Sequence, residues 1–384
     1  MEKDSSQVVR SIVSIQYFLY FGVLGIFLPY FNLYCYHIGL TGFQIGAISG
    51  IRSAAFALFP LLWGAIADRS GGQRPIYIFC SIMSMLIWAF YLMTSSFWPM
   101  LIITFFYGLF YSPIISFLEA ATMETLGKHK RHYGRIRAWG SISFILAVIG
   151  FGKFTDSFSM RLILFGILGI SLLQCAFSFG MPKTAALGKL LNAKQVQPLF
   201  TRGTVIFLIC GFLMLVSHGA YYGFFSIHLE TLGCSKTFIG AAWALAVTAE
   251  ILVMVNSGKL FRHLSLEKIL AYSFFIAAAR WLILSTCNTP AILFASQILH
   301  AFTYGAFHMA SILYMDRLSP EKSKTMGQAV NNAVTYGLGL MVGFFLSGAL
   351  YKAAGAYSLF LINAGIALAA GILFRYRGGV TIGS

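Results

Sequence analysis

The sequence has little charge. Only 10% of its 384 residues are Asp, Glu, Lys or Arg, and 58% are hydrophobic, whereas a soluble domain typically carries about 25% charged residues. Acidic residues are especially scarce, with 11 Asp and Glu against 27 Lys and Arg. This composition excludes a soluble globular enzyme and a disordered chain, and it favours an integral membrane protein built from many helices.

The sequence also lacks the motifs of metal sites, disulfide frameworks and ATP-driven machines. Its six cysteines are scattered through or beside apolar runs, with no CxxC motif or Cys/His cluster. No Walker sequence is present, and the glycine-rich stretch 337–343 lies inside an apolar run, where small residues let helices approach closely. We therefore expect no metal, no cofactor and no ATP-driven step.

Twelve apolar runs are long enough to span a bilayer, which takes about 20 residues each. They cover roughly 12–36, 44–67, 75–95, 98–126, 133–153, 160–181, 203–230, 237–261, 267–287, 290–315, 325–351 and 356–375. The first run has no clear small-residue cleavage site, so we interpret it as a spanning helix. The longest polar gap predicts a linker over 183–202 between six-helix bundles at 1–182 and 203–384.

Positive charge is distributed unevenly between the two ends of these helices. Twenty of the 27 Lys and Arg fall on the side that would hold both termini, and three lie within apolar runs. The opposite side has only Lys153, Arg161, Lys236 and Lys352. Short loops rich in Lys and Arg stay cytoplasmic, so both termini are expected in the cytoplasm, and the positive net charge does not indicate nucleic-acid binding.

The two halves repeat weakly with an offset of 194 residues. Gly39, Gly46 and Gly64 correspond in this way to Gly233, Gly240 and Gly258. Two related bundles with a substrate site near the membrane midplane between them are a known transporter plan.

The loop after the second run carries a charged motif. Gly64-Ala-Ile-Ala-Asp68-Arg69-Ser-Gly71-Gly72-Gln-Arg74 resembles the signature loop between helices 2 and 3 of the major facilitator superfamily. The resemblance implies that a gating latch is formed by Gly64, Asp68, Arg69, Gly72 and Arg74. The second half has a degraded copy, 258–263, without the aspartate.

Few ionisable side chains lie within the apolar runs. Such residues are costly in lipid and are expected to face a polar cavity or a partner. Glu119 and Arg137 come to similar depths on two successive helices, and His300, Tyr304 and His308 share one helix face at four-residue spacing. Each half brings one carboxylate and one arginine, because the second half adds Glu250 and Arg280.

The segment 133–141 resembles helix 5 of lactose permease and of bacterial 3-phenylpropionate permeases, and the likeness to the latter covers nearly the whole chain. It implies that Glu119 and Arg137 bind substrate together, and it matches Glu250, Arg280 and His300 to functional residues of lactose permease. There are two departures. Thr303 stands where lactose permease has its proton-carrying glutamate, and Phe144 stands where it has a sugar-stacking tryptophan. Phe144 lies two turns after Arg137, and this pairing suits a carboxylate with an apolar body.

The sequence thus predicts an all-α membrane protein of twelve helices with the major facilitator fold, in a bacterial-type inner membrane. The expected function is proton symport of a small organic solute, with an aromatic or other monocarboxylate as first choice. The predicted substrate-binding residues are Glu119, Arg137, Phe144, Tyr221, Tyr222, Trp243 and Arg280, and the predicted proton carriers are Glu250, His300 and His308. The partners expected are substrate, protons and lipid, and the resemblance implies a monomer.

Four alternatives stay open at this point. A sugar or nucleoside proton symporter would use the Glu119–Arg137 pair, and a uniporter or antiporter would share the fold. A sensor without transport would differ only in the absence of flux. A membrane enzyme is disfavoured, because His308 and Asp316 are too isolated to form a metal site or a nucleophile–base pair.

Overall fold

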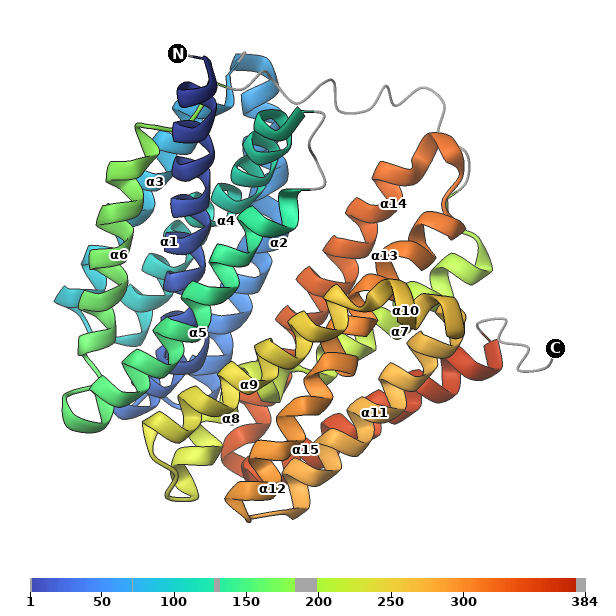
Figure 1. Cartoon of the computed structure of the whole chain (residues 1–384). Helices are drawn as coiled ribbons and strands as arrows, with labels where there is room; N and C mark the ends of the chain where they lie inside the picture. The colour runs from blue at the N-terminus through green and yellow to red at the C-terminus, as the bar shows by residue number, and fades with distance from the viewer. Residues whose placement is uncertain (1, 71, 128–131, 184–198, 378–384) are drawn as a thin grey trace. The chain divides into compact units, whose positions relative to one another are not determined.

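The computed structural model describes residues 2–70, 72–127, 132–183 and 199–377, and every regular element in them is a helix (Figure 1). The elements before residue 184 are α1 (Glu2–His37), α2 (Gly42–Ser70), α3 (Gln73–Ala89), the 3-10 helix η1 (Phe90–Met93), α4 (Phe97–Leu126), α5 (Tyr133–Ser157) and α6 (Leu162–Ser178).

The remaining elements begin at Arg202. They are α7 (Arg202–Ser217), α8 (Gly219–Thr231), α9 (Lys236–Val255), α10 (Ser257–His263), α11 (Leu266–Thr286), α12 (Pro290–Ala295), η4 (Ser296–Leu299), η5 (Ala301–Ala306), α13 (Phe307–Leu318), η6 (Glu321–Ser323), α14 (Lys324–Asn331), η7 (Asn332–Gly339) and α15 (Leu340–Arg377).

The predicted twelve-helix architecture is confirmed. Within the described residues, nine helical stretches are long and apolar enough to cross a membrane. One of them, Lys324–Arg377, contains the last two predicted spans, which separate where Gly355 adopts a positive φ of 71°. The other two predicted spans are α6 and the broken stretch α12–η4–η5–α13.

The weak sequence repeat has a counterpart in the backbone. Gly39 and Gly233 end α1 and α8 with φ values of 84° and 81°, a left-handed conformation that glycine adopts without steric cost. The residue after each glycine donates a backbone hydrogen bond to a carbonyl five residues earlier, from Leu40 to Cys35 and from Cys234 to Leu229. Each half therefore makes the same turn into its next helix.

Contacts divide the chain into two units, each of which borrows one segment from the other half. Unit 1 comprises Met1–Leu40, Ala55–Asn192 and Ser235–Ala241, and unit 2 comprises Thr41–Ala54, Ala193–Cys234 and Ala242–Ser384. Residues 184–198, most of the predicted linker 183–202, lie outside the described residues. The predicted bundle boundaries stay a prediction.

The borrowed segments join their units through glycines that allow close backbone approach. In unit 2, a side chain at Gly46 would meet the Phe344 carbonyl and Gly348 of α15. In unit 1, a side chain at Gly240 would meet the Val148 carbonyl of α5. Since Gly46 and Gly240 are 194 residues apart, the repeat places equivalent small residues at equivalent packing points.

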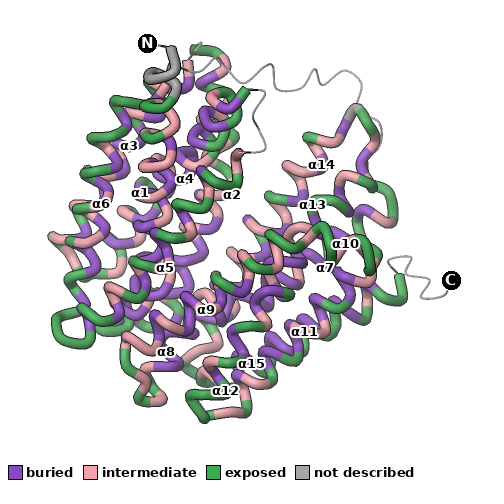
Figure 2. Tube along the Cα trace, viewed as in Figure 1, coloured by how far each residue is buried: buried purple, intermediate pink, exposed green. Residues whose placement is uncertain are grey.

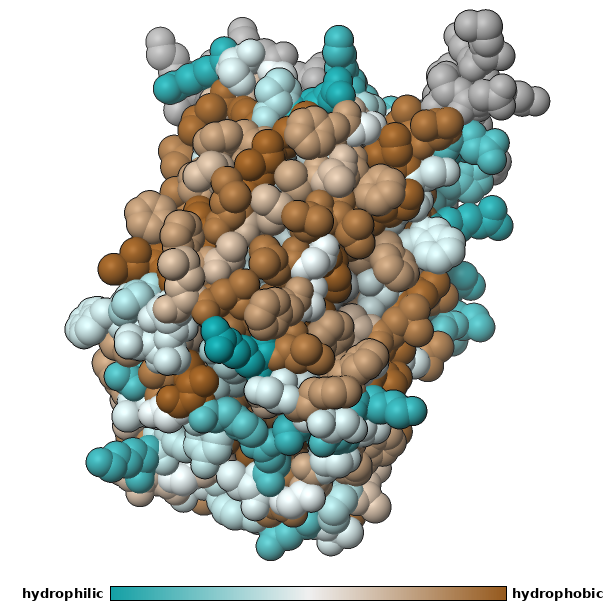
Figure 3. Space-filling view, turned by 90° about the vertical axis from the view of Figure 1, so that its left-hand side faces the viewer, coloured by the Kyte–Doolittle hydropathy of each residue, from teal (hydrophilic) through white to brown (hydrophobic). Residues whose placement is uncertain are grey.

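Apolar side chains also cover much of the outer surface. Leu58, Leu146 and Leu172 are 60%, 60% and 57% exposed, and the buried residues lie along the other faces of these helices (Figure 2). On the face drawn in Figure 3, brown apolar residues form a broad central region with teal polar residues toward both ends. Exposure on this scale would drive aggregation in water and is normal for a surface in contact with lipid.

Candidate functional site

A polar cluster in unit 2 is centred on Arg280. This arginine of α11 is 0% exposed, so its charge needs partners within the protein. Its Nη2 donates to Oε1 of Gln297 at 2.6 Å, and its Nη1 donates to Nδ1 of His300 at 3.0 Å and to Oγ1 of Thr303 at 3.2 Å. The guanidinium also lies 4.2 Å from the ring centre of Tyr221, close enough for a cation–π interaction.

His300 connects this arginine to Glu250. Because a guanidinium can only donate, Nδ1 of His300 must accept, and the ring proton of the neutral imidazole then resides on Nε2. That nitrogen faces Oε2 of Glu250 at 3.6 Å, and the Glu250 side chain is 19% exposed. Arg280, His300 and Glu250 therefore form a chain that leads from a fully buried cation to a glutamate whose side chain is partly exposed.

Aromatic rings enclose the cluster. Tyr221 lies 5.1 Å from Trp243 and 5.6 Å from His300, measured between ring centres. Tyr222 is within 6.3 Å of His300 and 6.2 Å of Tyr304. Tyr221 and Trp243 are buried, whereas Tyr222 and Tyr304 keep part of their surface exposed. The predicted residues Tyr221, Tyr222, Trp243, Arg280, Glu250 and His300 are thus brought together.

His308 continues the row of rings. Tyr304 stacks on both sides, at 5.4 Å from His300 and 5.9 Å from His308, as the four-residue spacing predicts. Nδ1 of His308 is 2.7 Å from the hydroxyl of Tyr336. Sequence reasoning missed Tyr336, since nothing in the sequence shows that its helix packs beside His308.

Two π-helical segments, η5 (Ala301–Ala306) and η7 (Asn332–Gly339), contribute residues to this cluster. Thr303 and Tyr304 belong to the first and Tyr336 to the second. π-helical turns are rare and occur frequently at functional sites. Gly305 of η5 lies against Glu250, where any side chain would meet the glutamate, so the close approach of η5 to α9 depends on a small residue.

Unit 1 holds a second, more open polar cluster. Glu119 of α4 is exposed, and it interacts electrostatically with Arg137 of α5 and accepts a hydrogen bond from Tyr133. The guanidinium of Arg137 stacks 3.7 Å above the ring centre of Phe21 and lies 5.8 Å from that of Tyr17. The predicted Glu119–Arg137 pair is thus placed together, and α1 contributes two rings that sequence reasoning missed.

Small residues make room for this arrangement. A side chain at Gly140, one turn after Arg137, would meet both the Phe21 ring and Nη1 of Arg137. Phe144 lies one further turn along α5 and is buried at 5% exposure, with its backbone packed against Gly25 of α1. Arg137 is partly exposed, whereas Arg280 is 0% exposed, so Arg137 is the more accessible of these two arginines.

The predicted gating loop lies at the end of α2 and the start of α3. Oδ1 of Asp68 is buried and has no hydrogen-bond partner among the described residues. Nη2 of Arg74 donates to the Phe179 carbonyl beyond α6, Arg69 is exposed, and a side chain at Gly64 would meet open space. The latch role of this loop stays a prediction.

No metal site accompanies these clusters in the part of the chain that the structure describes, because no three His, Cys, Asp or Glu side chains gather there. What the two clusters can do is bind an anion at an arginine, hold an apolar or aromatic body, and take up a proton on a carboxylate.

Comparisons with known proteins show which family the chain belongs to. A family model described as "MFS_1 like family" matches residues 11–362. The chain is 29% identical to a probable 3-phenylpropionic acid transporter of Escherichia coli (strain K12), over 93% of this chain and 95% of that protein. It is 24% identical to a maltose permease of Geobacillus stearothermophilus, over 86% of this chain and 84% of that protein.

Among solved structures, a point mutant of the nucleoside transporter NupG superposes with a TM-score of 0.88. Its sequence identity is 17%, and the match covers 96% of this chain and 99% of that one. At this identity the likeness concerns the fold.

Proposed function

The chain belongs to the MFS_1-like family and is a multi-pass secondary transporter of the major facilitator superfamily, and from this premise we propose that it carries a small organic monocarboxylate in symport with protons. An aromatic monocarboxylate is the first choice. The observation that carries the proposal is the chain of contacts Arg280–His300–Glu250, enclosed by aromatic rings.

The substrate class is supported by the pairing of arginines with rings. Arg137 stacks on Phe21 and is only partly buried, so it would bind the carboxylate directly. Arg280 is fully buried and bonded to three side chains. Its role is to hold His300 and Gln297 in place.

The proton is assigned to Glu250. Nδ1 of His300 already accepts from Arg280, so a second proton on this imidazole would break a bond to a buried cation. Glu250 has a partly exposed side chain and a ring N–H facing its carboxylate, and it can gain or lose a proton without disrupting the Arg280 contacts. His308 is a second candidate, because Tyr336 can rotate its hydroxyl away.

The test is uptake into proteoliposomes of purified protein with 3-phenylpropionate, maltose and uridine as substrates. Symport of one monoanion with one proton is electroneutral, so a pH gradient should accelerate phenylpropionate uptake and a membrane potential should not. Protein-free liposomes measure the passive leak of the protonated acid. Uptake that ignores a pH gradient refutes proton coupling, and transport of maltose or uridine alone refutes the substrate class.

Glu250→Gln separates coupling from binding. It should abolish gradient-driven uptake and preserve exchange of labelled for unlabelled substrate, because exchange returns a loaded carrier without releasing the proton. Glu321→Gln is the matched control, since the Glu321 side chain is 86% exposed. Gradient-driven uptake by Glu250→Gln at the normal rate would remove Glu250 from the mechanism.

Arg137→Ala tests the carboxylate contact. We expect substrate affinity to fall about 10- to 100-fold, the loss that follows removal of a charge-assisted hydrogen bond. Arg135→Ala is the control, because Arg135 is an exposed arginine two residues earlier on the same helix. Near-normal affinity in Arg137→Ala would place the carboxylate elsewhere.

A sugar substrate is the second candidate, favoured by the interaction of Glu119 with Arg137, which offers both an acceptor and donors to hydroxyl groups. The maltose permease relative points the same way. The substrate panel above decides between the two. The inner-membrane location, cytoplasmic termini and monomeric state belong to the same proposal and rest on the charge distribution of the sequence and on the resemblance.

A further inference from the structure

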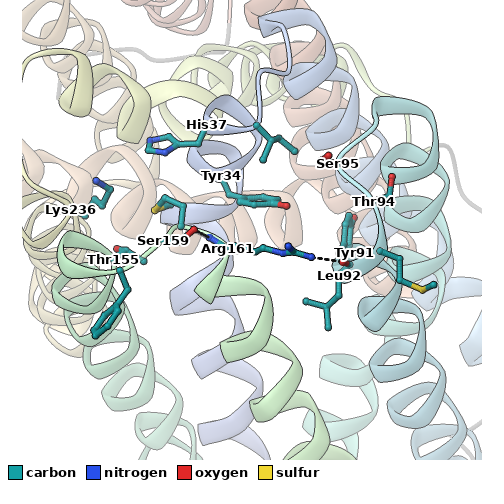
Figure 4. Close-up of a pocket in the computed structure, with 14 residues that line it drawn as sticks. Tyr34, His37, Tyr91, Leu92, Thr94, Ser95, Thr155, Ser159, Arg161 and Lys236 are labelled. Atoms are coloured by element: carbon teal, nitrogen blue, oxygen red, sulfur yellow. Dashed lines mark hydrogen bonds between the residues drawn. The ribbon is translucent and has the colours of Figure 1, made fainter.

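Unit 1 contains a cavity that shares no lining residue with either polar cluster. It has a volume of about 550 Å³, within the range of small-molecule sites. We call it the end cavity, because it lies where α1, η1 and α5 finish (Figure 4). Its basic lining residues are His37, Arg161 and Lys236.

The end cavity combines cationic groups with aromatic rings, aliphatic side chains and hydroxyl groups. Tyr34, Tyr91 and Phe158 supply rings, and Ile38 and Met160 supply aliphatic surface. The lining contains no Asp or Glu. A cavity lined by cationic groups and without a lining carboxylate fits an anion better than a cation, and its rings can contact the apolar body of an organic anion.

Arg161 is held in place and still has donors to offer. Its Nη2 donates to the Leu92 carbonyl at 2.7 Å, and Figure 4 shows its side chain extended beneath Tyr34 toward Leu92. A guanidinium has five N–H donors. No carboxylate among the described residues forms a salt bridge with Arg161, although Asp156 lies on the preceding helix.

Asp156 is occupied elsewhere. Its Oδ1 accepts from the backbone N–H of Lys236 at 2.7 Å, and its Oδ2 accepts from the backbone N–H and the hydroxyl of Thr237 at 3.0 and 2.6 Å. These bonds satisfy the first turn of α9. They also fix the backbone of Lys236, whose side chain lines the end cavity on the side away from Leu92 (Figure 4).

We propose that the end cavity is an entry subsite that binds the carboxylate of an organic monoanion on Arg161, with the apolar body against the surrounding rings. The inference rests on the proposed function, because Arg161 and Lys236 belong to the side predicted to face away from the cytoplasm, where an imported monocarboxylate arrives. The subsite concentrates the substrate anion at unit 1 before it reaches Arg137.

The test uses Ser95→Cys as a reporter, because Ser95 lines the cavity and is exposed. Cys175, Cys234 and Cys287, which are partly accessible, are replaced by serine. Intact cells are treated with two membrane-impermeant thiosulfonates, one anionic and one cationic. We expect the anionic reagent to react about tenfold faster, after correction for their rates with free thiol. Equal rates for the anionic and cationic reagents would overturn the proposed subsite. Reaction only in inverted vesicles would overturn it as well.

Ligand protection identifies the chemistry. 3-Phenylpropionate should slow the labelling of Ser95→Cys, and 3-phenylpropanol, which has the same body without charge, should not. Inorganic phosphate and phosphatidylglycerol vesicles are the other two arms. Protection by either of these without protection by phenylpropionate would make the cavity a phosphate or lipid-headgroup site and overturn the proposal.

Charge variants complete the test. Arg161→Gln should remove the protection and the preference for the anionic reagent, and Arg161→Lys should retain part of both. Lys153→Gln, which removes an exposed cation of α5 outside the cavity lining, should change neither. Retained protection in Arg161→Gln would exclude this arginine as the carboxylate contact.

The two proposals can fail separately. Arg137→Ala should lose uptake while its end cavity is still protected by phenylpropionate. Protection without uptake in the unmodified protein would refute the proposed function and leave the subsite standing. Uptake without protection would refute the subsite alone.

Discussion

Replacing Arg280 by methionine tests whether the cluster in unit 2 is held together as its geometry indicates. The variant keeps a long apolar stem and removes three hydrogen bonds, to Gln297, His300 and Thr303. Interhelical hydrogen bonds in membrane proteins contribute about 0.6–1.7 kcal/mol each, and the desolvated contact with Tyr221 adds about 1–2 kcal/mol. The free energy of unfolding should therefore fall by about 3–7 kcal/mol.

The measurement is unfolding of purified protein by SDS in mixed micelles, followed by tryptophan fluorescence. Arg262→Met is the control, because Arg262 is an exposed arginine on the short helix α10. In Arg280→Met the Gln297 amide keeps one donor, because the Tyr221 hydroxyl also donates to its Oε1 at 3.1 Å, so this oxygen is not left unpaired. A loss below about 1 kcal/mol in Arg280→Met would refute the view that Arg280 organises the site.

Three further predictions concern unit 1. Asp156→Ala should lower the free energy of unfolding by about 1–2 kcal/mol, as the loss of a helix cap does. It should also speed hydrogen exchange of the backbone amides at 236–240, and unchanged exchange there would show that the cap is dispensable. Gly140→Leu should lower the free energy of unfolding by about 1–3 kcal/mol, because the new side chain overpacks against Phe21 and Arg137. It should also weaken substrate binding, and a normal dissociation constant would contradict the proximity of Gly140 to the binding site. Asp68→Asn should impair transport with an unchanged unfolding curve, and normal uptake would remove the latch role of this carboxylate.

The site could be predicted from sequence where local geometry decides. The four-residue spacing of His300, Tyr304 and His308 places three rings in one stack even across a π-helical segment. Glu119 and Arg137 are close in sequence and lie on two successive helices, so their depths follow from the rise of a helix. The sequence did not predict that Gln297 and Thr303 accept hydrogen bonds from Arg280, because these contacts depend on how α11 packs against η4 and η5.

The sequence by itself determined the membrane environment, the twelve spanning helices and the turns at Gly39 and Gly233, because hydrophobic length and a left-handed glycine act over a few residues. Only the tertiary structure decided that Arg280 is buried behind His300, that Phe21 and Tyr17 stack with Arg137, and that residues 235–241 pack in unit 1. These outcomes join residues from 20 to more than 200 positions apart, and they depend on side-chain packing between helices, which no local pattern specifies.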